Sequence, residues 1–397
     1  MTATAKPKLP GAIVALGVVS FLNELSSQIV APLIPLLLAT VLGAGPVALG
    51  LIEGLADAVA NLLKLWAGRR SDVLGQRRKG FIMGGYGLSL IARPMIGLVV
   101  NWPMVMLLRS LDRAGKGLRG APRDALVADM TPAALRGRAY GLNRAFDYAG
   151  AVGGSLIAAA ALTYVSGSIS TVILLSAIPG GIALIVLALL VKNAPTATVK
   201  PAAAAVSLKW SVLSVPARRF MTVLAVFSHS RVSESFILLR AHDLGMPTVN
   251  VLLLWALICA LQSVVAWFGG GLSDRFSKST VVSASWLAYG LGLLLIAFAT
   301  GTGSLWVAAS CYALLSGIGE GAEKTYVSDL ATDAGRGTAF GWYSMIVGLS
   351  SIPAGLAFGL VWMQLGADIA FAGFGILAVI STAGLYFYAR QDIANVR

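Results

Sequence analysis

Charged side chains recur along one stretch of the chain, Leu107 to Met130, which is long enough to cross a membrane. They follow one another at steps of three and four residues, which places them on one face of a helix. The charged members are Arg109, Asp112, Arg113, Lys116 and Arg123, and Gly120 lies on the same face. An ionised side chain near the bilayer centre costs roughly 2.5–3.5 kcal/mol, so this face must meet partners or a water-filled path. The alternative interpretation is a soluble amphipathic helix with a solvated charged face.

Acidic residues of another apolar stretch, residues 47–68, are the expected partners of these cations. If both stretches cross the membrane in the same direction, Glu53 and Asp57 lie at a depth comparable to that of Arg109. We therefore predict a mixed-charge network between the two helices, which can extend to Arg93 of the segment between them.

One acidic residue, Glu24, stands near the middle of the first apolar stretch with no basic residue beside it in the sequence. A carboxyl held away from water resists ionisation, which suits a group that binds and releases a proton near neutral pH. Glu24 is therefore our first candidate for a proton-coupling site, with Gln28 in the same polar cluster and Asp147 as the alternative carrier. The competing interpretation is a carboxyl that is hydrogen-bonded to the polar residues around it.

The second half of the chain carries a smaller set of ionisable residues in apolar stretches. It comprises His229, Arg231, Glu234, Glu320, Glu323 and Lys324. We place Glu320 and Glu323 in the same central cavity as the charged face of the first half. Glu323 stands 200 residues after Arg123, so the second half reverses the charge at this place, which could supply opposite charges across an interface. His229 is expected to be a packed or hydrogen-bonded residue.

The composition excludes a soluble protein. Of 397 residues, 57% are hydrophobic and 12% are charged, and the mean hydropathy is +0.82. A soluble core does not hide so many apolar side chains. A bilayer core of about 30 Å needs about 20 apolar residues per helical span, and the long unbroken runs of this chain fit helices better than the short alternating strands of a barrel. The chain is therefore predicted to be an all-α polytopic membrane protein.

Basic residues concentrate in alternate connections between the apolar runs. A net charge of +13 and a pI near 10 would suggest a nucleic-acid partner in a soluble protein. The connections LGAGPV and NWPM carry no charge, whereas those around Arg69, Lys200 and Arg275 are basic. This alternation is what the positive-inside bias produces, and it places both termini in the cytoplasm. We expect no nucleic-acid partner.

Cysteine and histidine are scarce, with two residues of each in the chain. They supply no disulfide framework, zinc set or Cys/His catalytic pair, so we expect no metal site and no enzyme activity. The first apolar run lacks a clear small-residue cleavage site at its end and is expected to be a retained first helix rather than a signal peptide.

Apolar runs bounded by glycine, proline and charge clusters give about twelve predicted spans. They are residues 11–41, 47–68, 80–101, 103–124, 137–163, 170–192, 217–241, 248–270, 280–300, 304–328, 337–363 and 368–389. The longest polar interruption divides them six and six. We predict an N-terminal six-helix bundle over residues 1–192, a cytoplasmic linker over 193–216 and a C-terminal six-helix bundle over 217–397.

Short motifs of the first half return in the second half in the same order. VADM at Val127 and RGRAYG at Arg136 recur 200 residues later as VSDL and RGTAFG. GRRSD at Gly68 recurs 202 residues later as GGLSD at Gly270. Three matches at nearly one offset indicate a duplication. Two related six-helix halves with a site between them are expected of a rocker-type secondary transporter.

The connection after the second span carries the most specific motif. Its sequence, GRRSDVLGQRRK from Gly68 to Lys79, resembles the G-x-x-S-D-x-x-G-x-R-R/K signature loop of the major facilitator superfamily. In that family the loop acts as a conformational latch, which implies gating roles for the loop residues, their second copy and their cytoplasmic partners. These residues are Gly68, Asp72, Arg77, Asp274, Arg123 and Asp129. The alternative interpretation of the arginines is charge that only sets topology.

Two further segments resemble functional motifs of the same superfamily. Arg109 resembles the arginine of the family's fourth helix that is implicated in proton coupling, although Asp112 and Arg113 replace the usual Gln and Gly, and a structural ion-pair network is the competing interpretation. The glycine-rich fifth span is similar to the antiporter motif of drug exporters, with Ala151 in place of the expected proline. Small residues spaced along a span also let two helices approach closely. The fourth span resembles a branch that includes arsenic-resistance efflux permeases.

These features predict a twelve-helix transporter with two pseudo-symmetric bundles, in the inner membrane of a bacterium and surrounded by lipid. It is expected to be a monomer that moves a small solute by alternating access. No nucleotide-binding loop G-x-x-x-x-G-K-[ST] occurs, so the proton gradient is the expected energy source and no cofactor is expected. The expected function is proton-coupled efflux of a drug-like or toxic compound.

Three alternatives remain open. An uptake symporter for an anionic nutrient or a metal chelate is favoured by the excess of cations in the fourth span. A membrane-embedded enzyme would need a metal set or a nucleophile beside a base, and neither is evident. A channel is disfavoured by the duplicated loop motif.

Overall fold

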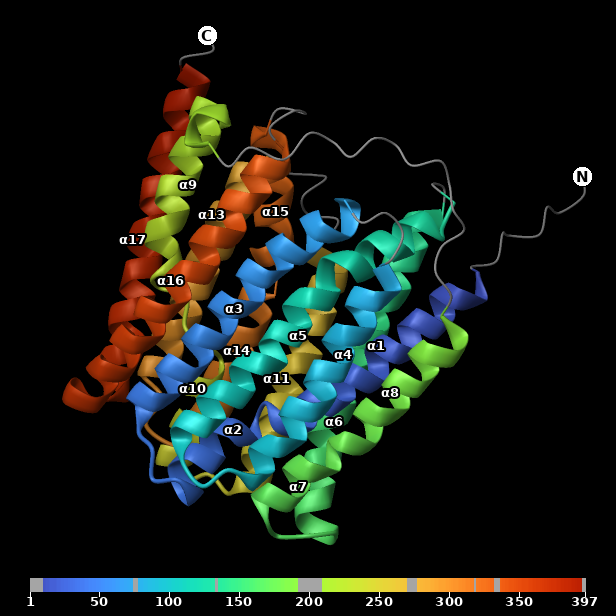
Figure 1. Cartoon of the computed structure of the whole chain (residues 1–397). Helices are drawn as coiled ribbons and strands as arrows, with labels where there is room; N and C mark the ends of the chain where they lie inside the picture. The colour runs from blue at the N-terminus through green and yellow to red at the C-terminus, as the bar shows by residue number, and fades with distance from the viewer. Residues whose placement is uncertain are drawn as a thin grey trace, which may run out of the picture.

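The computed structural model describes residues 10–73, 78–132, 135–191, 209–269, 277–317, 319–331 and 336–394. Within these ranges the chain is helical and contains no strand, which confirms the predicted all-α class. Figure 1 shows the helices packed side by side as one bundle. We call the end of the bundle where α1 begins and α17 ends the terminal end, and the opposite end, where α2 lies, the far end.

The first half contains six membrane-crossing segments. In chain order they are α1 (Gly11–Val30) continued by α2 (Leu33–Leu36) and the π-helix η1 (Leu37–Val41), α3 (Pro46–Val73), α4 (Arg78–Met95) continued by η2 (Ile96–Leu98), α5 (Trp102–Asp129), α6 (Arg136–Tyr164), and α7 (Ile169–Leu175) continued by α8 (Ala177–Leu190). Local sequence explains several helix starts. Asn101, for example, accepts a hydrogen bond of 3.1 Å from the backbone N–H of Met104 and so caps α5.

The second half repeats this plan. Its segments are the short η4 (Trp210–Val212), α9 (Val215–Ser228) with α10 (Ser235–Asp243), α11 (Thr248–Gly269), α13 (Lys278–Ala297), α14 (Thr302–Ser316) with α15 (Gly319–Leu330), α16 (Arg336–Leu365) and α17 (Ala367–Ala394). Ser214 and Ser277 cap α9 and α13 through their side-chain oxygens. The predicted linker, 193–216, lies outside the described residues as far as residue 208, so the boundaries of the halves stay a prediction.

The spans agree with the predicted twelve to within a few residues. In the described part of the chain, nine are long and apolar enough to cross a membrane by length and composition alone. The remaining three are α5, which carries the charged face, and the pairs α9 with α10 and α14 with α15, each of which is interrupted. The fourth, seventh and tenth spans therefore deviate from simple membrane helices, and the same spans supply most of the candidate site.

Glycines set the close packing of α6 on α1, as the glycine-rich fifth span predicts. A methyl group built on Gly150 would lie 2.6 Å from the carbonyl oxygen of Phe21, and one built on Gly154 would lie 2.5 Å from that of Leu25. Only a residue without a side chain permits this approach. The two glycines lie against the turn of α1 that carries Glu24, so their packing positions that carboxyl.

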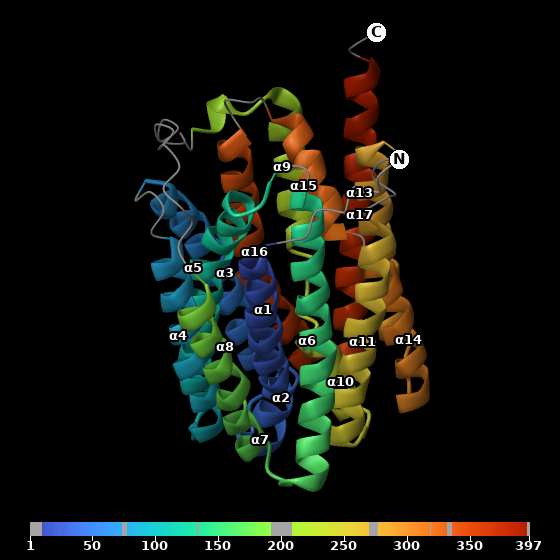
Figure 2. The same ribbon diagram turned by 90° about the vertical axis from the view of Figure 1, so that its right-hand side faces the viewer.

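The most extensive contacts between the halves are those of α3 with α16 and of α6 with α11. Figure 1 shows α3 alongside α16, and Figure 2 shows α6 beside α11. The contact of α3 with α16 runs through glycines, and the Oγ of Ser351 donates a 2.8 Å hydrogen bond to the carbonyl oxygen of Gly54. It begins at Pro46, at the far end, and reaches Asn61.

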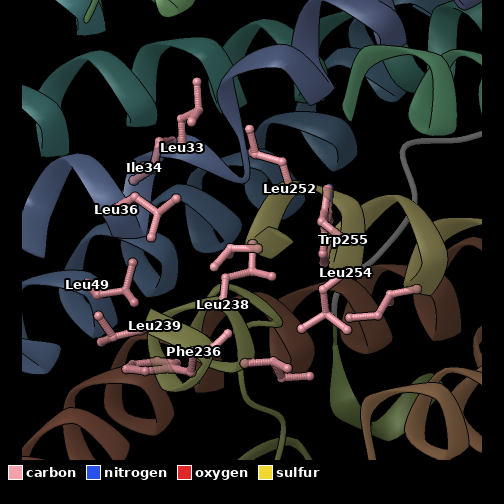
Figure 3. Packing of buried hydrophobic residues seen from close by; sticks show 14 of the residues in the cluster. Leu33, Ile34, Leu36, Leu49, Phe236, Leu238, Leu239, Leu252, Leu254 and Trp255 are labelled. Carbon is pink, nitrogen blue, oxygen red and sulfur yellow. The ribbon is translucent and has the colours of Figure 1, made fainter. Parts of the chain in front are cut away.

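A buried apolar cluster closes the far end. Figure 3 shows it where α2 and the start of α3 meet α10 and the start of α11. Its labelled members are Leu33, Ile34, Leu36, Leu49, Phe236, Leu238, Leu239, Leu252, Leu254 and Trp255. Because residues from both halves bury apolar surface together, the hydrophobic effect stabilises their contact at this end. The structure is therefore that of a transporter-like bundle closed at the far end.

Candidate functional site

The charged face of α5 is neutralised by an acidic residue of α3. The guanidinium of Arg109 forms two hydrogen bonds with the carboxylate of Glu53, at 3.1 and 3.2 Å. Both side chains are almost fully buried, at 2% and 3% exposure. Arg113 lies 4.0 Å from the same carboxylate. The predicted network between these two helices is confirmed, and a bidentate pair of this kind satisfies charges that could not face lipid.

A second buried pair brings in α4. Arg93 donates a 2.8 Å hydrogen bond to Asp112, and Arg109 lies 3.6 Å from the other oxygen of that carboxylate. Arg93 also donates to the hydroxyl of Ser26 and the carbonyl oxygen of Asn23 in α1. Arg93 is therefore a member of the network and links three helices to α1. Glu53 and Arg93 were predicted as partners of the charged face and not as candidate site residues, yet each forms one of the two buried ion pairs of the network.

Asp57 and Lys116 are less buried than the ion pairs described above. Asp57 is half-buried, and among the described residues no cation lies within 4 Å of its carboxylate. The charge of Arg113 acts on it more strongly than that of any other cation. Lys116 is exposed although it lies mid-span, and Glu24 is the charged group that acts on it most strongly. An exposed lysine directed toward α1 fits a wet space between the halves better than lipid.

Arg123 joins α5 to α1 and α6. It donates a 2.7 Å hydrogen bond to the hydroxyl of Ser20 and lies 3.6 Å from the carboxylates of Asp124 and Asp147. Asp147, the alternative proton carrier, therefore has an arginine beside it. One turn earlier, Arg119 donates to Ser89 and stacks over a tyrosine of α4.

Glu24 is connected to the other half of the molecule. Its carboxylate accepts a 3.0 Å hydrogen bond from the side-chain amide of Gln28. The amide oxygen of Gln28 in turn accepts a 2.9 Å hydrogen bond from the indole N–H of Trp255 in α11. Trp255 is a residue that sequence reasoning missed, since 227 positions separate it from Gln28 and its surroundings are plain apolar helix. Glu24 and Gln28 thus lie at a contact between the halves.

The second half has its own buried ion pair. Arg231 bonds to Glu323, which also accepts hydrogen bonds from the indole of Trp286 at 2.7 Å and the hydroxyl of Tyr343 at 2.8 Å. The sequence assigned no partner to Glu323, and in the structure its cation comes from the same half. His229 is hydrogen-bonded to the carbonyl oxygen of Ala225, as expected of a non-ligand histidine. The side chain of Glu320 lies outside the described residues.

The gating residues lie at the terminal end. Asp129 pairs with Arg78 at 2.8 Å, and 200 residues later Asp329 pairs with Lys278 at 2.5 Å. The same ion pair therefore joins the end of the fourth span to the start of the third in each half. Gly68 lies against α5, where an added methyl group would be 3.2 Å from Ala121.

Other gating residues cannot be placed. Arg77 and Asp274 lie outside the described residues, as does the side chain of Asp72 in α3. Their roles, and those of the cavity residues above, stay predictions. Among the described residues no cluster of acidic, histidine or cysteine side chains could hold a metal ion.

Duplicated six-helix halves, buried intramembrane ion pairs and interrupted spans define a polytopic secondary transporter. The sequence profile of the Major Facilitator Superfamily matches residues 16–352. An uncharacterised MFS-type transporter of Methanocaldococcus jannaschii is 33% identical over 380 residues, which cover 94% of this chain and 93% of that protein. The chain belongs to the Major Facilitator Superfamily, and it is a transporter and not an enzyme.

Two other comparisons are informative at different levels. A variant of the nucleoside transporter NupG superposes with a TM-score of 0.77 at 13% identity, covering 95% of this chain and 99% of that chain, which shows the shared fold. The multidrug resistance protein MdtH of Yersinia enterocolitica is 34% identical over 140 residues, which cover 34% of this chain and 33% of that protein.

Proposed function

We propose that the protein exports a small solute in exchange for protons across the inner membrane of a bacterium. The terminal end of the bundle then faces the cytoplasm, because the basic connections lie at that end. The protein acts as a monomer and uses the proton gradient in place of a cofactor. The similarity of part of the chain to a multidrug resistance protein supports export of a drug-like or toxic compound.

The observation that carries this proposal is the chain of hydrogen bonds from Glu24 through Gln28 to Trp255. An ionised carboxylate holds the amide N–H₂ of Gln28 toward itself and so directs the amide oxygen at the indole N–H. A hydrogen bond to a charged acceptor is roughly twice as strong as a neutral one. Protonation of Glu24 therefore weakens a contact between the two halves.

The link between the charge of Glu24 and the contact of the halves determines on which side of the membrane the proton is released. The ionised form of Glu24 stabilises the state closed at the far end, so the carboxyl releases its proton while the site faces the cytoplasm. A proton bound from the far side favours the opposite state by the same linkage. Export follows if the solute binds to the ionised site, because solute and proton then exclude each other and move in opposite directions.

A second candidate function, uptake of an anionic nutrient or metal chelate with protons, is favoured by the cations of α5. Lys116 is exposed, and Glu24 is the charged group that acts on it most strongly. Arg113 is 18% exposed and lies 4.0 Å from Glu53. An anion could bind these two cations when the acids are protonated. Solute and proton would then move together.

The test uses everted membrane vesicles and proteoliposomes that contain the full chain. Tetraphenylphosphonium, ethidium and arsenite are added in turn, and a pH-sensitive dye reports proton movement. We expect at least one solute to move against the protons, and an uncoupler to abolish its uphill transport. Movement of solute and protons in the same direction would support the uptake symporter and contradict export.

The variant Glu24→Gln separates coupling from transport. Glutamine keeps an oxygen that can accept from Gln28 but binds no proton, so we expect proton-driven uphill flux to be lost while solute-for-solute exchange continues. Asp368→Asn is the matched control, because Asp368 is 66% exposed and stands in the first turn of α17. Retention of full proton-driven flux in Glu24→Gln would show that Glu24 is not the coupling residue.

A further inference from the structure

The seventh span is interrupted in its middle. α9 ends at Ser228 and α10 begins at Ser235, so residues 229–234 leave the helix within the membrane. The hydroxyl of Tyr289 in α13 accepts a 2.9 Å hydrogen bond from the backbone N–H of Val232 and lies 3.4 Å from the carbonyl oxygen of Ser230. A polar side chain of another helix thus satisfies the opened backbone. Such an interruption is tolerated where it is buried in protein or lines a cavity, and it often marks a transport site.

Glu234 is the last residue of this interruption. Its half-buried carboxylate accepts hydrogen bonds from the amide of Gln262 at 2.5 Å and from the hydroxyl of Tyr312 at 3.2 Å. The amide of Gln262 also lies 3.2 Å from the hydroxyl of Ser316, the last residue of α14. The interruption of the seventh span and the end of α14 therefore meet at one glutamine of α11.

Glu234 differs from the other intramembrane acids of the described chain. Glu24 and Asp57 also lack an ion pair, but the charges of Lys116 and Arg113 act on them, whereas only neutral groups act on Glu234. Among the described residues, Glu53, Asp112 and Glu323 each bond to an arginine, whereas no lysine, arginine or histidine lies within 4 Å of Glu234. Arg231, three residues earlier, is directed at Glu323 and not at Glu234. An ionised carboxylate with only neutral partners in a poorly hydrated site is costly.

Among the described residues, the groups that face Glu234 from the neighbouring helices carry no positive charge. The titratable ones are Tyr312 of α14, Tyr289 of α13 and Cys259 of α11. α2 and the start of α3 present the apolar residues of the far-end cluster. The described part of the protein therefore leaves an ionised Glu234 without a compensating charge.

α11 connects this carboxyl to the one in the first half. Trp255, Cys259 and Gln262 follow one another at helical steps of four and three, so they share one face. Trp255 bonds to the partner of Glu24, and Gln262 bonds to Glu234. Cys259 lies between them on this face. A change of charge at Glu234 is thus felt by the same helix face that holds the contact between the halves.

We propose that Glu234 binds a mobile positive charge, either a proton or the cationic group of a solute, as the acidic residue of the second half of the transport site. The proposal rests on the proposed proton-coupled transport, but it does not depend on its direction. Each half then contributes one binding acid, Glu24 in the first half and Glu234 in the second, and α11 connects the two. Binding of this positive charge changes the strength of the hydrogen bonds from Gln262 and Tyr312 to Glu234. Through these bonds it acts on both interrupted spans.

The test is an infrared difference titration of the full chain in proteoliposomes. A protonated carboxyl gives a carbonyl band that titrates with pH, and we expect part of this band to disappear in Glu234→Gln. Glutamine retains an oxygen that accepts from Gln262 and Tyr312, so the variant should fold, and an unchanged melting temperature checks this. Asp329→Asn, in an exposed ion pair at the terminal end, is the control that should leave the band intact.

Binding of tetraphenylphosphonium distinguishes the two sources of charge. If the solute's cation binds Glu234, the affinity falls at least tenfold in Glu234→Gln and falls in the wild type as the pH is lowered. If only the proton binds Glu234, the variant Glu234→Gln loses part of the infrared band, and its affinity for tetraphenylphosphonium is unchanged. An intact band together with unchanged affinity in Glu234→Gln overturns the proposal. A symporter would still show either effect, so failure of the export assay and failure of this inference are separate results.

Discussion

Gly50 of α3 and Gly355 of α16 lie so close that a methyl group built on either would overlap the carbonyl oxygen of the other. The next turn repeats the contact, with Gly54 against the backbone of Ser351. These residues belong to different halves and lie toward the far end. The closed far end therefore depends on the absence of side chains along this line, as in other close helix crossings in membranes.

Substitution Gly355→Ala should prevent full closure of the far end. The added methyl group cannot be accommodated unless the two helices separate, because it meets backbone and not a flexible side chain. We expect the distance between spin labels at the far ends of α3 and α16 to increase and transport to fall. Gly373→Ala in α17 is the control, since open space surrounds that position. An unchanged distance distribution in Gly355→Ala would contradict this account of the closed state.

Removal of one acid from the buried network should cost more than removal of its neighbour one turn away. Glu53→Gln removes the bidentate partner of buried Arg109 and leaves it only Asp112 at 3.6 Å, and loss of one member of a buried pair costs about 3–5 kcal/mol. Asp57→Ala removes a half-buried carboxylate with no cation within 4 Å among the described residues and should be milder, although it still impairs transport. Thermal unfolding in detergent measures the difference. Equal melting temperatures for the two variants would show that the Glu53–Arg109 pair contributes little.

The glycines of α6 should differ in how well they tolerate substitution by alanine. Gly150→Ala and Gly154→Ala force α6 away from α1, beside Glu24 and Gln28. Gly153→Ala should be tolerated, because its nearest contact is a leucine methyl group at 3.8 Å. We expect the first two variants to lose proton-driven transport and the third to keep it, measured at matched amounts of protein. Loss in all three would point to a general requirement for glycine in this helix.

The duplicated ion pairs at the terminal end should affect rates more than stability. Exposed ion pairs contribute about 0–1 kcal/mol, so Asp129→Ala should leave the melting temperature almost unchanged. If Asp129 and Arg78 act as a latch, the variant should alter the transport rate, and the exchange Arg78→Asp with Asp129→Arg should restore it. Asp329→Ala tests the copy in the second half. Normal transport in both alanine variants would leave these pairs with a role in topology alone.

Sequence reasoning placed the spans correctly because the signal is local. Each span needs its own apolar residues, and its backbone hydrogen bonds close within the segment. The glycines of α6 and the repeated motif around Asp129 and Asp329 were also readable, since spacing and repetition need no knowledge of neighbours. The same reasoning identified α5 as the charged span and named Glu53 and Asp57 as its partners by depth, with Arg93 as a further member. Of the two acids, Glu53 forms the ion pair with Arg109.

The tertiary structure alone decided which partner each charge has. The sequence assigned no partner to Glu323, which pairs with Arg231 of its own half. Glu24 is hydrogen-bonded through Gln28 to Trp255, and Glu234 has two neutral partners and no cation in the described chain. Depth along a span can be counted from sequence, whereas the rotation of each helix and its neighbours depend on packing between segments that are far apart in the chain. For that reason the sequence by itself determined a duplicated membrane transporter, and only the packed helices determined which partners its buried charges have.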